Sequence, residues 1–579
     1  MIKNSYLKIK GGQAPFASLI SKGAWPLLGF LLFFSTHSLE AATGTKAMVA
    51  TADPRATQAA LEVLKGGGNA VDAAIAAQWV LNVVEPQSSG IGGGGFFLFY
   101  EASSKHVFTY DGRETAPAKA FAEMFLDPQG TPYLFDPDRI TGGLPVGVPG
   151  VLKLLSQVHE KHASGKFSFA ELFDPAIRYA ENGFEISQRM AYFLDREKER
   201  LRLFGETKKI FFDEDGLPYG EGYILKQPDL AETFRLIQKE GIGPFYEGEI
   251  ALSMVKAVQE VPFHPGFMEL EDLQGYKVAE RPAVSQNYRG YEVFSMGPPS
   301  SGGTTLTEAL NILEIFPLAA YGRSVEGFYF FSQAQKIAFE DRNRYSGDSD
   351  FVNVPVEKLI SKDFAHERAK NISGIEPVLS ETKESESSEP TSNTSHISIV
   401  DEAGNMVSFT TTIEAVFGCA MVVPGRGFFL NNELTDFEAI PHDLEGNLHP
   451  NSLQPGKRPR SSMTPTFVFR DGRPFLIAGS PGGPRIIGAV LNVMVNLIDF
   501  GMKLDEAMAA PRMIHRGNSA ELEEELFQNQ EIKTGLENKG MAVSQTSAIG
   551  NVQAIYFDSD QKWIVGQSDS RGEGRAEGY

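Results

Sequence analysis

The stretch ETKESESSEPTSN (residues 381–393) and its continuation TSHISIVDEAGNMVSFTTTIE (394–414) decide the fold of this chain. The first part is rich in Glu, Ser and Thr and has no periodic apolar residue, which is typical of a flexible linker, here spanning 372–393. The second part alternates apolar and polar residues around the turn DEAGN, a pattern that predicts a β-hairpin. We therefore expect Thr394 at the first position of a buried strand, directly after a flexible segment.

A hydroxyl in that place has a specific chemical use. Cleavage of the Asn393–Thr394 bond would give Thr394 a free α-amine beside its own hydroxyl, and such an amine can act as the base for the nucleophile. The ordinary pKa of an α-amine is near 8, so the neutral, basic form is available at physiological pH. The pattern thus predicts the precursor of a self-cleaving hydrolase.

Bulk properties limit the possible functions. The chain has 579 residues, of which 42% are hydrophobic and 22% charged, so one large or two to three modest globular domains are expected. The net charge of -21 argues against a nucleic-acid partner, because phosphate binding requires clustered Lys and Arg. Cys419 is the one cysteine, which excludes an intramolecular disulfide, and the histidines form no HExxH pattern; no metal or organic cofactor is expected.

The N-terminus has the pattern of a secretory signal. Several lysines precede an apolar run from Trp25 to Phe34, and small residues follow near Ala41. This predicts a signal peptide over 1–41 and a secreted or periplasmic protein. An uncleaved N-terminal membrane anchor is the alternative, although the run is short for a membrane span.

Strands and helices alternate along the rest of the chain. A nearly all-apolar helix is expected at 70–83, and two more helices within 304–345. Beyond the first hairpin, GFFLN (427–431) reads as a strand, FVFRDGRPFLIAGS (467–480) as a second hairpin, and PGGPRII as the start of a helix. Strands clustered around 394–480 and flanked by helices predict a layered α/β fold.

Two short patterns suggest other functions. Gly90, Gly92 and Gly95 satisfy G-x-G-x-x-G, but a helix precedes them and a strand follows, the reverse of a dinucleotide site. Close backbone packing explains these glycines better. AGSPG (478–482) resembles the nucleophile elbow G-x-S-x-G with its first glycine replaced, which leaves a serine hydrolase as a weak alternative.

Seven segments in order resemble the γ-glutamyltranspeptidase (glutathione hydrolase) family. The resemblance covers nearly all of the chain after the signal. It implies the αββα sandwich of N-terminal-nucleophile hydrolases, with autocleavage into a large subunit (42–393) and a small catalytic subunit (394–579) that stay paired. The segments are EPQSSGIGGGGFF (85–97), DGRETAPAKA (111–120), 394–418, GFFLNNELTDF (427–437), PGKRPRSSMTPT (455–466), AGSPGGPRII (478–487) and SDSRGEGRAEGY (568–579).

The resemblance assigns catalytic roles to four positions. Thr394 would be the nucleophile, and Thr412 the residue whose hydroxyl hydrogen-bonds it. Gly482 and Gly483 would form the oxyanion hole. Their sequence context agrees, because they precede a helix expected to begin near Arg485, where backbone N–H groups point toward developing negative charge.

The resemblance also implies a clamp for a glutamyl head group with free α-groups. Arg113 would grip the α-carboxylate bidentately, helped by the hydroxyls of Ser461 and Ser462. Glu433 and Asp436 would receive the α-ammonium from the opposite side. Glu414 departs from the asparagine of well-known members, and its contact with the head group would add negative charge.

The expected activity is hydrolysis and transfer of γ-glutamyl groups from glutathione and related compounds, with water or acceptor amino acids and dipeptides as the second substrate. Two alternatives share the scaffold, a β-lactam acylase and a poly-γ-glutamate hydrolase. A third alternative is a secreted binding protein without activity, which the nucleophile, its partner threonine and the Gly-Gly pair disfavour.

Overall fold

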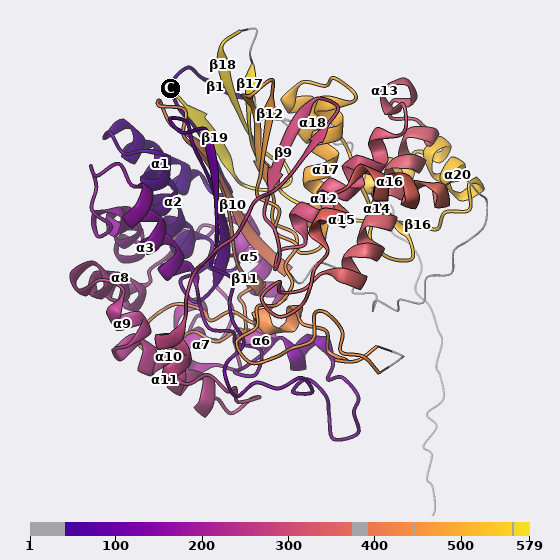
Figure 1. Ribbon diagram of the computed structural model, residues 1–579. Coiled ribbons are helices and arrows are strands. Elements are labelled where there is room, and N and C mark those ends of the chain that lie inside the picture. Colours follow the sequence, from indigo (N-terminus) through magenta and orange to yellow (C-terminus); the bar gives the residue numbers. More distant parts are fainter. Residues whose placement is uncertain (1–40, 373–391, 444–445, 559–560) are drawn as a thin grey trace, which may run out of the picture. The chain divides into compact units, whose positions relative to one another are not determined.

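The computed structural model describes residues 41–372, 392–443, 446–558 and 561–579 (Figure 1). These residues belong to one compact unit, Leu39–Tyr579. The predicted signal peptide therefore lies outside the described residues, apart from Ala41. Most of the predicted linker also lies outside them. Of its described residues, Ile372 belongs to a 3-10 helix and Asn393 to a strand.

The predicted first hairpin forms the centre of a seven-stranded antiparallel sheet. Strand β10 pairs with β11 through the turn at 401–405, and β11 pairs with β3 on its other side. The order across this sheet is β19-β2-β10-β11-β3-β4-β7. The bounds are β2 Met48–Thr51, β3 Gly94–Glu101, β4 His106–Asp111, β7 Ala279–Glu280, β10 Ser392–Val400, β11 Met406–Ala415 and β19 Arg575–Gly578.

The second predicted hairpin lies in another seven-stranded antiparallel sheet. Its turn residues Asp471 and Gly472 both have positive φ, as a tight two-residue hairpin requires. The order is β1-β18-β17-β13-β12-β9-β8. The bounds are β1 Ala42–Gly44, β8 Val284–Tyr288, β9 Tyr291–Ser295, β12 Thr466–Arg470, β13 Arg473–Gly479, β17 Gln553–Asp558 and β18 Trp563–Ser568.

Helices cover the outer faces of both sheets, so four layers follow one another from left to right in Figure 1. Helix α2 packs on β10 and β11, and α3 on β3 and β4; α12 packs on β8 and β9, and α17 on β13. The apolar helix predicted at 70–83 is α2, and all of its residues are buried. The bounds are α1 Pro54–Lys65, α2 Ala70–Val84, α3 Val151–His162, α12 Gly302–Glu314, α14 Val325–Tyr345, α17 Arg485–Ile498 and α18 Leu504–Ala509.

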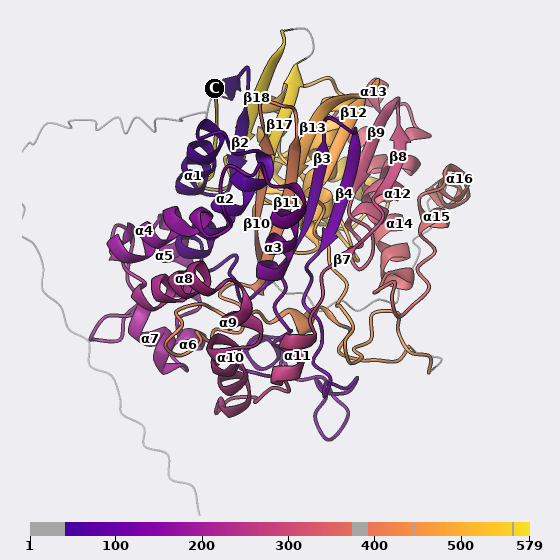
Figure 2. The same ribbon diagram turned by 60° about the vertical axis from the view of Figure 1, so that its left-hand side comes forward.

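Smaller helices extend the layer beside the first sheet, as the turned view shows (Figure 2). They are α4 Asp174–Asn182, α5 Gln188–Arg196, α6 Lys198–Leu201, α7 Gly205–Phe211, α8 Pro228–Glu240, α9 Gly243–Tyr246, α10 Glu249–Glu260 and α11 Leu270–Gly275. On the other side lie α13 Leu318–Tyr321, α15 Val356–Leu359, α16 Lys362–Ala369, α19 Glu524–Gln528 and α20 Gln530–Asn538, with a small sheet of β14 Met513–His515, β15 Ala520–Glu523 and β16 Val543–Thr546.

The two large sheets face each other across an apolar core. Phe96 and Leu98 of the first sheet pack in one cluster with Phe467 and Ile477 of the second. Burial of such side chains contributes roughly 25 cal/mol per Å² of apolar surface. This αββα sandwich confirms the fold class predicted from the sequence.

One predicted strand is wrong. GFFLN (427–431) forms isolated bridges instead of a strand, Val422 with Phe429 and Gly92 with Leu430. The backbone of this segment packs against the glycine loop that leads into β3 instead of joining a sheet ladder.

Candidate active site

Thr394 and Thr412 lie directly opposite each other on β10 and β11. Their side chains are buried and their hydroxyl oxygens are 3.3 Å apart. Thr394 is the third residue of its strand and not the first, as the sequence had suggested, because Ser392 already pairs with Ala415. A register shift follows between Ser392 and Thr394, and it brings the two threonines into register.

The hydroxyl of Thr412 connects the nucleophile candidate to the predicted cleavage site. It donates to the carbonyl oxygen of Asn393 at 2.9 Å and accepts from the backbone N–H of Glu414, also at 2.9 Å. A hydrogen bond to a carbonyl oxygen stabilises the negative charge that nucleophilic attack creates there.

The glycine loop before β3 packs against the backbone of Thr412. A side chain at Gly93 would meet the Thr412 carbonyl oxygen at 2.1 Å, and one at Gly92 would meet the Phe429 carbonyl oxygen at 2.2 Å. These glycines therefore permit close backbone approach, as the sequence indicated, and the loop has no dinucleotide-binding context.

A row of polar residues continues inward from Thr394 on the same face of the hairpin. The ring of His396 contacts the Thr410 hydroxyl through Nδ1 (2.8 Å) and the Ser398 hydroxyl through Nε2 (3.1 Å). Ser398 in turn donates to the carbonyl of Gln553 in the second sheet, so this face points between the sheets. Complete burial lowers the pKa of His396 to about 3, which keeps the imidazole neutral.

Ser480 does not have the surroundings of a nucleophile. A nucleophile elbow exposes its serine oxygen, whereas Ser480 is fully buried. Its hydroxyl donates to the Pro481 carbonyl and accepts from the Asn551 N–H. These contacts give Ser480 a structural use and remove the support for a serine hydrolase.

Gly482 and Gly483 lie in the turn between β13 and α17. Their φ angles are +130° and +54°, a region that favours glycine. Their carbonyls accept from the N–H groups of Arg485 and Ile486 and so begin the helix. Within the described part of the chain, no hydrogen bond from either glycine N–H to a protein acceptor is found.

Arg113, Glu433 and Asp436 meet in a buried ion-pair cluster. One terminal nitrogen of Arg113 donates to Glu433 and the other to Asp436. Arg113 and Glu433 are each 1% exposed, while Asp436 is 36% exposed and faces outward. The sequence placed the arginine and the carboxylates at opposite ends of a ligand; in the structure they bind each other directly.

The cluster contains more carboxyl groups than guanidinium groups. Glu114 lies 3.9 Å from Arg113, and Glu414 is also buried nearby. Burial raises the pKa of Glu433 well above its usual range against the opposing effect of Arg113. Burial, together with Asp436 and Glu433, raises the pKa of Glu414 likewise. A site with several carboxylates around one guanidinium favours an additional cation.

Glu414 links this cluster to Thr412. Its backbone N–H bonds Thr412, and its carboxylate accepts from Thr435 at 3.3 Å and from Asn432 at 2.5 Å. Its φ of +74° is unusual for a residue with a long side chain. Sequence reasoning missed Asn432 and Thr435; their only signal was their position beside Glu433 in NNELTDF.

Ser461 and Ser462 lie on a loop that touches Arg113. The Arg113 guanidinium donates to the carbonyls of Pro459 and Arg460 at 3.2 and 3.3 Å, immediately before the two serines. Ser461 Oγ accepts from the Met463 N–H, and Ser462 Oγ accepts from Arg342 at 2.8 Å. The backbone of this loop therefore contacts Arg113, whereas the two serine hydroxyls contact Met463 and Arg342.

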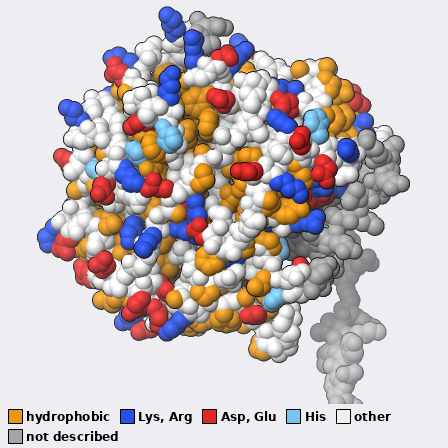
Figure 3. All heavy atoms as spheres, in the orientation of Figure 1, with side chains coloured by type: hydrophobic (Ala, Val, Ile, Leu, Met, Phe, Trp, Pro, Cys, Tyr) orange, Lys and Arg blue, Asp and Glu red, His pale blue; other side chains and the backbone are white. Residues whose placement is uncertain are grey.

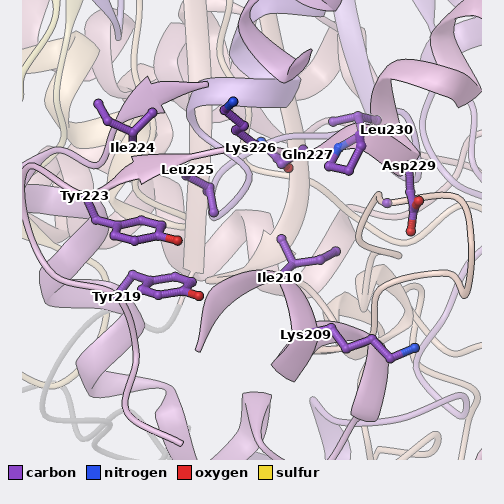
Figure 4. A pocket seen from close by; sticks show the side chains of 12 residues that line it. Lys209, Ile210, Tyr219, Tyr223, Ile224, Leu225, Lys226, Gln227, Asp229 and Leu230 are labelled. Atoms are coloured by element: carbon purple, nitrogen blue, oxygen red, sulfur yellow. The ribbon is translucent and has the colours of Figure 1, made fainter. Parts of the chain in front are cut away.

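A separate cavity of about 430 Å³ contains none of the predicted site residues. It lies between α7, β6 (Ile224–Leu225) and the start of α8, where the rings of Tyr219 and Tyr223 stack with their centres 3.7 Å apart (Figure 4).

The surface in Figure 3 shows acidic and basic side chains interspersed, without a continuous basic area on that face. No group of His, Cys, Asp and Glu in the described ranges is arranged for a metal ion, and no helix there is long and apolar enough to cross a membrane.

Comparisons with known proteins agree with this geometry. The family described as Gamma-glutamyltranspeptidase matches residues 56–579. The glutathione hydrolase proenzyme of Bacillus subtilis (strain 168) is 39% identical over 554 residues, 92% of each chain, and that of Escherichia coli (strain K12) is 38% identical over 548 residues, 92% of this chain and 91% of the relative. The crystal structure of cephalosporin acylase from Bacillus halodurans has a TM-score of 0.79 at 27% identity and covers 93% of this chain and 97% of its own.

Two facing antiparallel sheets between helix layers, with a buried threonine hydroxyl near the start of a central strand, define the class of N-terminal-nucleophile hydrolases. Within that class, the chain belongs to the γ-glutamyltranspeptidase family.

Proposed function

We propose that the chain is the precursor of a glutathione hydrolase and γ-glutamyltransferase that matures by cleavage at Asn393–Thr394. The observation that carries the proposal is the Thr412 hydroxyl, which donates to the Asn393 carbonyl oxygen while lying 3.3 Å from the Thr394 hydroxyl oxygen. One residue therefore contacts both the nucleophile and the bond to be cut.

Maturation proceeds by an N-to-O acyl shift. The Thr394 oxygen attacks the Asn393 carbonyl carbon, the C–N bond breaks, and the hydroxyl proton passes to the departing Thr394 nitrogen. Water then hydrolyses the resulting ester, which leaves a carboxylate on Asn393 and a free amine on Thr394. The large subunit (42–393) and the small subunit (394–579) stay associated through the shared first sheet, where β2 and β3 flank β10 and β11.

Turnover repeats the same chemistry on a γ-glutamyl amide. The freed amine takes the Thr394 hydroxyl proton as the oxygen attacks the γ-carbonyl. The N–H groups of Gly482 and Gly483 receive the oxyanion. The amine product leaves with a proton, and the γ-glutamyl ester on Thr394 is resolved by water or by an acceptor amino acid or dipeptide.

Recognition of the glutamyl head group involves the charged cluster. An α-carboxylate that enters beside Arg113 replaces one of its carboxylate partners, and that partner becomes available to an α-ammonium. Asp436 suits this exchange because it is the exposed member of the cluster. Ser461 and Ser462 add donors to the α-carboxylate, and Glu414 adds charge on the ammonium side.

Secretion completes the proposal. The basic and apolar pattern of residues 1–41 supports export to the periplasm or the exterior, and an uncleaved anchor is its alternative.

The likeness to a cephalosporin acylase makes acylase activity the second candidate. The buried Arg113 with its acidic partners favours a zwitterionic glutamyl group over the side chains of other acyl donors.

Denaturing gels and a substrate panel test these points. The wild-type protein should give two bands, Thr394→Ala a single precursor band, and Thr394→Ser two bands at a slower rate. The mature protein should release glutamate from glutathione and leave a cephalosporin with a glutaryl side chain intact. A chain that never splits yet hydrolyses γ-glutamyl anilide would contradict the mechanism, and a preference for the cephalosporin would favour the acylase.

A further inference from the structure

The side chains on both sides of the Asn393–Thr394 bond are held by residues far away in the chain. Arg189 donates through Nη2 to the side-chain oxygen of Asn393 at 2.6 Å. On the other side of the bond, the Ser395 hydroxyl donates to Glu85 Oε2 at 2.5 Å. Glu85 and Arg189 also face each other, with Oε1 3.9 Å from Nε. The four side chains form one chain of contacts that spans the bond.

Both distant residues are positioned by helices. Glu85 directly follows α2 as its C-cap, and its N–H donates to the Leu81 carbonyl at 2.8 Å. Arg189 lies in α5, where its N–H donates to Glu573 Oε1 at 2.8 Å and its guanidinium lies 4.9 Å from the Phe193 ring centre. Side chains anchored in this way lose little additional freedom when they bind the junction.

The electrostatic surroundings make Glu85 sensitive to pH near neutrality. Burial raises the pKa of Glu85 to about 7, while Arg189 and the Ser395 hydrogen bond oppose the shift and the charges of Asp53 and Glu573 add to it. Arg55, a further charged group near Glu85, is paired with Asp53.

We propose that Glu85 and Arg189 are positioning residues for self-cleavage, because they fix the side chains of Asn393 and Ser395 on either side of the scissile bond. The inference rests on the maturation step proposed above. Neither residue contacts the reacting atoms. Their effect is to restrict rotation of Asn393, which precedes the scissile bond, and of Ser395, the second residue after it. This keeps the Thr394 oxygen and the Asn393 carbonyl in an attacking arrangement.

The ionised form of Glu85 is the effective one. A carboxylate accepts the Ser395 hydrogen bond more strongly than a neutral carboxyl and also attracts Arg189. Self-cleavage should therefore slow as the pH falls through about 7. A glutamine at position 85 resembles the protonated carboxyl and should behave at every pH as the wild type does in acid.

The test is a pulse-chase experiment on the full-length chain, made by cell-free translation and chased from pH 5.5 to 8.5, with the precursor followed on denaturing gels. Arg189→Met should slow cleavage about tenfold, and Arg189→Lys should restore part of the rate. Glu85→Gln should slow cleavage at pH 8 and remove the dependence on pH near 7. Matched controls are Arg178→Met and Glu62→Gln, since that ion pair joins exposed side chains on α4 and α1; both should cleave as the wild type does.

Cleavage within twofold of wild type in Arg189→Met and Glu85→Gln would overturn the inference, as would an unchanged pH profile in Glu85→Gln. That second variant is isosteric, so its profile decides the question if Arg189→Met fails to fold. Wild-type protein that splits on time but releases no glutamate from glutathione contradicts the proposed activity and leaves this inference standing. Wild-type protein that is not cut at Asn393–Thr394 contradicts both.

Discussion

Arg113 and Glu433 are 320 residues apart in the chain, yet they form an ion pair in the interior, where each side chain is 1% exposed. The pair joins the region before the predicted cleavage site to the region after it. Removing one partner would leave an uncompensated buried charge, which is expensive in a protein interior. The ion pair between Arg113 and Glu433, which is proposed to take part in substrate binding, therefore also holds the regions before and after the predicted cleavage site together.

Substitution of Arg113 should separate these two contributions. Arg113→Met should lower the free energy of unfolding by about 3–5 kcal/mol, because Glu433 loses its partner. Arg113→Lys keeps the charge but lacks the two-pronged geometry, so it should raise KM for glutathione roughly tenfold or more with a smaller change in kcat. Denaturant unfolding and steady-state kinetics measure the two effects; Arg178→Lys at an exposed site is the control. An unchanged KM would remove Arg113 from the substrate clamp.

Thr412→Val should slow self-cleavage on the order of 100-fold. Valine has the shape of threonine but cannot donate to the Asn393 carbonyl, and loss of a donor of this kind typically costs 10²–10³ in rate. The precursor half-life on denaturing gels is the measurement. Thr411→Val is the matched control, since Thr411 donates to Gly94 and not to the cleavage site. Equal half-lives for the two variants would show that the Thr412 hydroxyl has no part in maturation.

Glu414→Gln should weaken binding of the substrate ammonium. It removes the ability of this side chain to ionise beside a substrate ammonium and keeps an oxygen that can accept from Asn432 and Thr435. We expect KM for glutathione to rise about tenfold, while stability at pH 7 is retained, because burial and the neighbouring carboxyl groups already favour the neutral form of Glu414 without substrate. Steady-state kinetics and thermal unfolding test this together. A variant that gains affinity would indicate that Glu414 repels the α-carboxylate instead.

His396 should make the protein less stable in acid. Its pKa is about 3 in the folded protein against an ordinary 6.5, so between these values the unfolded chain binds one more proton than the folded chain. The free energy of unfolding should therefore fall by about 1.4 kcal/mol for each pH unit below 6.5 through this group alone. His396→Asn should remove this contribution, so the free energy of unfolding should depend less steeply on pH, by the equivalent of about one bound proton.

The free energy of unfolding is measured by urea unfolding between pH 4.5 and 7. The single-chain Thr394→Ala protein is compared with the same protein carrying His396→Asn. The exposed His106→Asn serves as control. Parallel pH profiles with and without His396 would mean that its burial is not maintained in solution.

Local patterns predicted a large part of the fold. Alternation with period two and an intervening turn were sufficient for both hairpins, β10–β11 and β12–β13, and an uninterrupted apolar run was sufficient for α2. GFFLN was mistaken for a strand because its apolar residues pack against a loop and not in a ladder. A short run of apolar residues does not distinguish these two uses.

The sequence by itself determined which side chains could do the chemistry, and that Thr394 enters a buried strand after a polar segment. Tertiary structure alone decided that Thr394 is the third residue of that strand, that Thr412 bonds the Asn393 carbonyl, and that Arg113 is bound by the carboxylates assigned to the other end of the ligand. It also brought Glu85 and Arg189 to the junction. The physical reason is that each of these contacts joins separate strands or helices, and their register and spacing follow from the packing of whole layers.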